Sequence, residues 1–155
     1  MERYRELVTT TRVYFNTYFM NELVMDEKEL EFSRLIEFTL MFEMFIGNLD
    51  IKTNLIDVRL VFFLIVYVDK YYLLCFDLNR GRYLIIDHVK RIGTVESRYG
   101  KIPRTIQRFF CNYLMTQNHP MHDKLRSKEA KLMRVVWEVS DIGPDCGLYL
   151  MRHME

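Results

Sequence analysis

Apolar residues recur at helical spacing in two stretches of the chain. The stretch 27–46 carries apolar positions three to five residues apart, with Glu and Lys between them early on: Leu30, Leu35, Phe38, Phe42 and Phe45. The stretch 102–118 carries a similar face: Ile102, Ile106, Phe109, Phe110, Tyr113 and Leu114. We therefore expect two amphipathic helices, the first ending at Gly47-Asn48 and the second at His119-Pro120.

Three shorter stretches are typical of strands. Residues 58–67, 71–76 and 83–86 are dominated by β-branched and aromatic residues, and the segment 77–82 between the last two carries the turn residues Asn79 and Gly81. We expect these strands at the centre of a sheet, and a further strand over 132–138. Residues 121–131 are densely charged, which indicates a solvated face, whereas residues 1–25 mix strand and helix signals.

Composition narrows the range of functions. The chain has 155 residues, half of them hydrophobic, and 22 basic against 21 acidic residues. This is one domain's length with ample core material, and its charge gives no general attraction to nucleic acid or to anionic lipid. The longest apolar run, 60–68, is far shorter than the roughly 20 residues of a membrane span.

The three cysteines also exclude some kinds of site. Cys75, Cys111 and Cys146 form no CxxC pair, and no histidine accompanies them at zinc-ligand spacing. We therefore expect no metal and no cofactor. An odd number of cysteines and no signal-peptide pattern favour a reducing intracellular compartment, nuclear or cytoplasmic.

The C-terminal block carries the first part of a family resemblance. Trp137 precedes Asp145-Cys146-Gly147 by a short loop, and Leu-Tyr-Leu-Met-Arg-His-Met-Glu follows to residue 155. The block resembles the nucleophile segment of the ubiquitin-like (SUMO) cysteine proteases, in particular of the plant transposon-associated type.

The central block carries the second part. Val61-Phe62-Phe63, the run 70–78 and Ile85-Ile86-Asp87 resemble the family's strands that hold the catalytic histidine and aspartate, and position 70 precedes Asp87 by 17 residues as in the family. The resemblance covers about 57–155 and implies an α+β, papain-like cysteine protease fold, with a central mixed sheet flanked by helices. Residues 1–56 form an unassigned N-terminal segment, which we expect to be helical and part of the same domain.

The resemblance implies a role for each matching position. Cys146 occupies the nucleophile position, and a thiolate is the attacking species. A helix N-terminus beside it favours the anion, and Gly147 allows backbone N–H groups to face an oxyanion. Asp87 occupies the position that orients the base, and Trp137 and Gly147 flank the family's channel for a Gly-Gly tail. The implied activity is hydrolysis after the C-terminal Gly-Gly of a ubiquitin-like modifier, with that modifier or its conjugates as partners.

The positions of the base and of the oxyanion donor depart from the family pattern. Lys70 stands where the family has its catalytic histidine, and an ammonium group is a poor proton acceptor at neutral pH. Ser140 stands where better-known members have the oxyanion glutamine, and its side chain is shorter. The histidines at 88, 119, 122 and 153 are interpreted as surface or structural residues rather than as a replacement base.

Plainer interpretations stay open for these residues. Cys146 is otherwise a buried structural thiol, Asp87 a strand-end cap, Trp137 a core residue and Lys70 an exposed lysine. Three hypotheses for the chain follow: a cysteine peptidase of this family with impaired activity, a non-catalytic pseudoprotease that binds a ubiquitin-like modifier, or a decayed transposon-derived fragment, truncated at its C-terminus.

Overall fold

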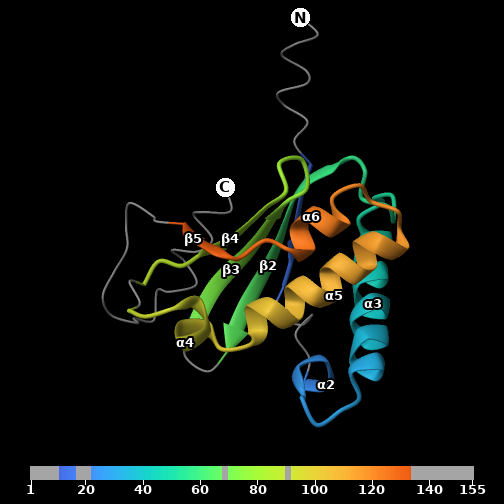
Figure 1. Cartoon of the computed structure of the whole chain (residues 1–155). Coiled ribbons are helices and arrows are strands. Elements are labelled where there is room, and N and C mark those ends of the chain that lie inside the picture. The colour runs from blue at the N-terminus through green and yellow to red at the C-terminus, as the bar shows by residue number, and fades with distance from the viewer. Residues whose placement is uncertain (1–10, 17–21, 68–69, 90–91, 134–155) are drawn as a thin grey trace, which may run out of the picture.

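A computed structural model of the chain describes residues 11–16, 22–67, 70–89 and 92–133. Within these ranges five strands form one sheet in the order β1-β2-β3-β4-β5 (Figure 1). The strands are β1 (Thr11–Phe15), β2 (Val58–Tyr67), β3 (Lys70–Asp77), β4 (Arg82–Ile86) and β5 (Lys131–Met133). The three central strands are the three that the sequence predicts.

The sheet is mixed. Strands β2, β3 and β4 pair antiparallel, whereas β1 pairs parallel to β2 and β5 pairs parallel to β4. The β2–β3 register sets Phe63 opposite Leu74, and the β3–β4 register sets Leu73 opposite Ile86. From the sequence we expected the N-terminal segment to be helical. Residues 11–15 of that segment instead form β1, which belongs to this sheet.

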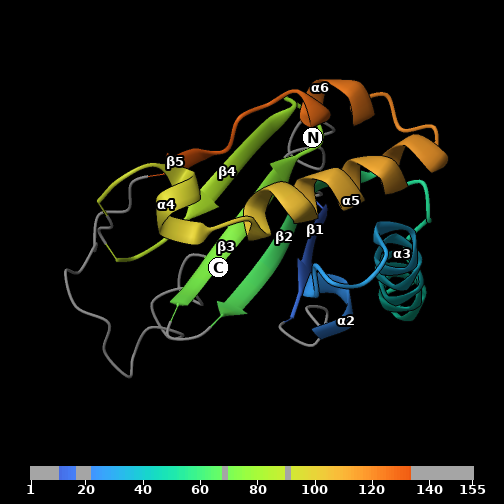
Figure 2. The ribbon, with the colours of Figure 1, turned by 60° about the horizontal axis from the view of Figure 1, so that its bottom comes forward.

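Five helices accompany the sheet in the described ranges. They are α2 (Glu22–Met25), α3 (Glu31–Asn48), α4 (Val95–Tyr99), α5 (Ile102–Thr116) and α6 (His122–Arg126). Helices α3 and α5 confirm the two predicted amphipathic helices, and Pro103 lies in the first turn of α5, where its missing N–H costs nothing. Figures 1 and 2 show α5 crossing one face of the sheet with α3 beside it.

The charged stretch 121–131 is not simply the solvated face that its composition indicates. Residues 122–126 form α6, and Leu125 within it is fully buried. The Gln107 side-chain amide on α5 donates hydrogen bonds to the carbonyls of Leu125, at 2.8 Å, and Lys128. The buried Leu125 side chain and the Gln107 amide thus attach this segment to the rest of the domain.

The core lies between the helices and one face of the sheet. Phe63 at its centre packs edge-on against Phe110 of α5 at 5.4 Å and stacks near Phe42 of α3 at 6.3 Å. Side chains alternate across a strand, so the neighbours of Phe63 point to the opposite face. There a smaller cluster gathers Phe62, Leu73, Cys75 and Ile86.

Residues 134–155 lie outside the described ranges, and the strand predicted over 132–138 is therefore seen only as β5. No described helix is long and apolar enough to cross a membrane.

Candidate active site

Asp87 lies immediately after the last residue of β4 and is almost completely buried, with 1% of its surface exposed. Its carboxylate accepts a hydrogen bond to Oδ1 from the backbone N–H of Val89 at 3.0 Å, and one to Oδ2 from the hydroxyl of Tyr99 at 2.8 Å. A buried carboxylate is costly unless such donors satisfy it. These two donors hold the Asp87 side chain in one orientation, which is what an orienting acid requires.

Helix α4 supplies the Tyr99 hydroxyl. The helix begins at Thr94, whose hydroxyl accepts a hydrogen bond from the Ser97 backbone N–H at 3.1 Å, and it ends before Gly100, whose φ is 64°. The Tyr99 ring also contacts the Tyr72 ring of β3, with 4.7 Å between their centroids. The short helix is therefore fixed at both ends, with its last side chain directed at Asp87.

Lys70 is the first residue of β3 and is half-buried. Its side chain lies on the same face of the sheet as those of Tyr72 and Leu74, because alternate residues of a strand share a face. The ammonium Nζ donates a hydrogen bond of 2.5 Å to the backbone carbonyl of Arg98. Helix α4 thus binds Lys70 through Arg98, and it binds Asp87 through the next residue, Tyr99.

The structure brings Lys70 and Asp87 into one neighbourhood. The β3–β4 register ends with Leu73 opposite Ile86, and one further step places Tyr72 beside Asp87. Lys70 lies two residues further along the same face. Among the ion pairs of the described residues none joins Lys70 to Asp87, so α4 links them through Arg98 and Tyr99 instead.

His88 is a neighbour of Asp87 that the sequence reasoning set aside. It is fully buried, and its Nδ1 lies 3.7 Å from Oδ1 of Asp87, which is longer than a normal hydrogen bond. Its burial agrees with a structural role. His119, which follows α5, is also buried, and its Nδ1 accepts a hydrogen bond from the Met121 backbone N–H at 3.1 Å.

The two described cysteines are core residues, as the sequence indicates. Burial raises the pKa of Cys75 to about 12, with Asp77 adding to the effect and Arg12 opposing it. Burial raises the pKa of Cys111 to about 12 as well, against the opposing charge of Arg126. Neither thiol is suited to nucleophilic attack at neutral pH.

The remaining predicted site residues, Trp137, Ser140, Cys146 and Gly147, lie outside the described residues. Their positions relative to Lys70 and Asp87 therefore stay predictions. In the part of the chain that the structure describes, no three His, Cys, Asp or Glu side chains gather as a metal site would require.

Tyr99 and the Arg98 carbonyl are the site groups that sequence reasoning missed. The Thr94 cap, the basic Arg98 in the last turn and Gly100 are the usual signals of a short helix, and they mark α4 in retrospect. Nothing in the sequence identifies the acceptor of the Tyr99 hydroxyl, because that pairing depends on how α4 packs against the end of β4.

No protein-family model and no curated protein matches this sequence. Solved structures do match it. The C-terminal Ulp1 protease domain in complex with Smt3, the yeast ortholog of SUMO, has a TM-score of 0.58 and 15% identity, covering 96% of this chain and 57% of its own. Two structures of the SUMO protease Ulp1, with the catalytic cysteine oxidised to a sulfonic or to a sulfenic acid, have TM-scores of 0.57 at 15% identity, covering 97% of this chain and 59% of theirs.

The chain thus spans somewhat more than half the length of these protease domains. At this identity the likeness concerns the fold, and it agrees with the α+β architecture and mixed central sheet expected from the sequence. The described chain has the fold of the Ulp1 SUMO protease domain.

Proposed function

We propose that this chain is a ubiquitin-like-protease domain that binds the C-terminal tail of a ubiquitin-like modifier. We also propose that it is a poor peptidase. The fold supports the first part of the proposal, since one of the similar structures holds a SUMO ortholog. The identity of the modifier and its conjugates is part of the proposal. So is an intracellular location, where such modifiers are found.

The observation that carries the second part is the hydrogen bond from Lys70 to Arg98. A cysteine peptidase needs a base that removes the thiol proton and returns it to the leaving amine. Lys70 stands in the position of that base, but its Nζ acts as a donor to a backbone carbonyl at 2.5 Å. An ammonium group held in this way has no lone pair to accept a proton.

The second candidate function is an active cysteine peptidase that cleaves after a C-terminal Gly-Gly. It is favoured by the Asp-Cys-Gly segment around Cys146 and by the carboxylate of Asp87, which its two hydrogen bonds hold ready to orient a base. On this hypothesis another group deprotonates Cys146, or Cys146 is a thiolate without assistance. A chemical probe distinguishes the two candidates.

The experiment uses SUMO with an electrophile at its C-terminus, added to the native chain, to Lys70→His and to Cys146→Ala. We expect no adduct with the native chain and an adduct with Lys70→His, since the imidazole restores an acceptor next to Asp87. Cys146→Ala should prevent the adduct when it is combined with Lys70→His. Binding of unmodified SUMO to the native chain, measured by calorimetry, tests recognition separately.

Each part of the proposal has its own contrary result. Rapid labelling of the native chain at Cys146 would show that it is an active peptidase. An absence of SUMO binding to both the native chain and Lys70→His would disprove modifier recognition. Labelling that persists in the Cys146→Ala background would show that the nucleophile position has been assigned to the wrong residue.

A further inference from the structure

A groove runs between the first half of α3 and the solvent-facing side of α5. Its cavity has a volume of about 590 Å³, and the apolar part of its lining comes from Phe32 and Leu35 of α3 and Phe109 of α5. Phe32 is 72% exposed, which is unusual for a phenylalanine within an 18-residue helix. An exposed aromatic side chain in a groove is a typical anchor point for a partner.

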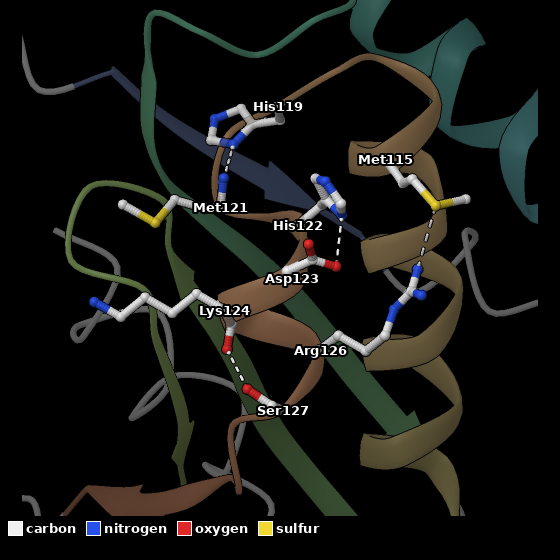
Figure 3. Close-up of polar contacts among 8 residues, drawn as sticks. All are labelled: Met115, His119, Met121, His122, Asp123, Lys124, Arg126 and Ser127. Atoms are coloured by element: carbon white, nitrogen blue, oxygen red, sulfur yellow. Dashed lines mark hydrogen bonds and ion pairs between the residues drawn. The ribbon is translucent and has the colours of Figure 1, made fainter.

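The lining of the groove also contains three arginines and one glutamate, Glu31. The arginines are Arg104 and Arg108 of α5 and Arg126 of α6. Arg108 is neutralised, since its Nε lies 2.7 Å from Oε1 of Glu31. Arg104 is exposed and makes no hydrogen bond or ion pair with another described residue. The Arg126 guanidinium makes a weak contact, from Nη2 to the Met115 sulfur at 3.8 Å (Figure 3).

The positive charge continues beyond the groove. Arg104 also lines the two neighbouring cavities, and one of these, of about 560 Å³, shares Arg126 and adds Lys128. Gln107 fastens α6 to α5 through its hydrogen bond to Leu125, and so holds Arg126 at this groove. Two guanidinium groups without a carboxylate partner among the described residues thus line the same groove as an exposed phenylalanine.

We propose that the α3–α5 groove docks a short acidic segment of a partner protein that carries a large apolar side chain. The planar guanidinium groups of Arg104 and Arg126 bind carboxylates in two-point geometry, and the apolar side chain packs on Phe32 and Leu35. This proposal is independent of the proposed activity, because none of these residues belongs to the candidate active site.

Charge argues against other occupants. Glu27, Glu96 and Glu129 line the two neighbouring cavities, so a continuous phosphate backbone would meet carboxylates on both sides. The net charge of +1 gives no general attraction to nucleic acid either. A peptide can place its carboxylates opposite Arg104 and Arg126 only, and avoid the acidic borders.

The test uses a fluorescein-labelled synthetic peptide of glutamate pairs separated by leucines, with fluorescence anisotropy as the readout. A second peptide has lysine in place of every glutamate. We expect saturable binding of the acidic peptide only, weakened about tenfold by Arg104→Glu combined with Arg126→Glu. Phe32→Ser should weaken it as well. Lys52→Glu is the matched control, an exposed cation just beyond the C-terminal end of α3, and should leave the affinity unchanged.

Four results would overturn the proposal. They are equal binding of the acidic and basic peptides, no effect of the double charge reversal, an equal loss in Lys52→Glu, and tighter binding of a labelled single-stranded oligonucleotide. Self-association that Phe32→Ser abolishes, measured by light scattering, would instead assign the groove to a second copy of the chain. All substituted side chains are exposed, and circular dichroism of each variant verifies that it is folded.

Discussion

The hydroxyl of Tyr99 donates a hydrogen bond of 2.8 Å to Oδ2 of Asp87, and both residues are at least 97% buried. The two residues come from different elements, the C-terminal residue of α4 and the residue that follows β4. The bond therefore joins a short helix to the end of β4, at the position where the family resemblance places the orienting acid.

Tyr99→Phe tests what this bond contributes. The substitution keeps the ring that contacts Tyr72 and removes a hydrogen-bond donor to a buried carboxylate. We expect the free energy of unfolding to fall by about 1–3 kcal/mol, because the carboxylate loses a partner that water cannot easily replace. Urea denaturation followed by circular dichroism measures this change.

Tyr71→Phe is the control for that experiment. Tyr71 is the neighbour of Tyr72 on the other face of β3, and its hydroxyl makes no hydrogen bond to a residue within the described ranges. Its loss should change stability by less than about 0.5 kcal/mol. Equal effects of the two substitutions would mean that the bond to Asp87 contributes nothing particular.

The parts of the fold that the sequence predicts are those with long, repeated patterns. Helices α3 and α5 and strands β2, β3 and β4 each present an apolar face over several turns or a dense β-branched run. Helices α4 and α6 have five residues each, too few for any period to emerge. Leu125 is the buried residue of α6, and a single leucine among charged neighbours does not make a periodic pattern.

In the candidate site, too, sequence patterns identify some residues, whereas the contacts of those residues depend on tertiary packing. Lys70 and Asp87 could be named as candidates because matching to a family needs only residue types at the right separation, and their roles stay predictions. Their actual partners, the Arg98 carbonyl and the Tyr99 hydroxyl, depend on where α4 packs, which is a tertiary contact between residues 12 and 28 positions apart. The local sequence around these residues does not predict such a contact.

The reactivity of Cys75 and Cys111 is a second prediction. Burial raises the pKa of each thiol to about 12, so at pH 7.5–8 the thiolate fraction is on the order of 10⁻⁵ to 10⁻⁴. In Cys146→Ala, which leaves only these two cysteines, Ellman's reagent should react slowly in native buffer and completely in urea. Rapid modification of either thiol in the native chain would show that its pocket opens to solvent.

The pH dependence of stability should reflect His119. Burial first, and then the charge of His122, lower the pKa of His119 below its usual 6.5. Its Nδ1 accepts the Met121 N–H in the neutral form (Figure 3). A histidine whose pKa is lowered by folding stabilises the fold above its unfolded pKa, and that stability is lost as the pH falls. We therefore expect the free energy of unfolding to decrease from pH 7 towards pH 5.

His119→Asn isolates this effect. The asparagine side chain offers an oxygen acceptor to the Met121 N–H but does not titrate in this range. Urea denaturation at a series of pH values between 5 and 8 should give a shallower slope for the variant than for the native chain. Parallel slopes would assign the pH dependence to other groups.

Two glycines give opposite predictions for the same substitution. Gly81, in the turn between β3 and β4, has a φ of 65°, and its backbone N–H donates to the Asp77 carbonyl at 2.8 Å. An added Cβ would lie 2.6 Å from Cδ of Lys124, but that side chain is flexible and can move. The strain of a side chain at positive φ remains, so Gly81→Ala should cost about 1 kcal/mol or more.

Gly47 lies in the last turn of α3, and a Cβ added there would meet nothing within 4 Å. Gly47→Ala removes the conformational freedom of a glycine from a helical position, and should stabilise the chain by up to about 1 kcal/mol. Thermal and urea denaturation of both variants measure the two effects side by side. If both substitutions destabilise, α3 ends before Gly47, because alanine benefits that position only while it is helical.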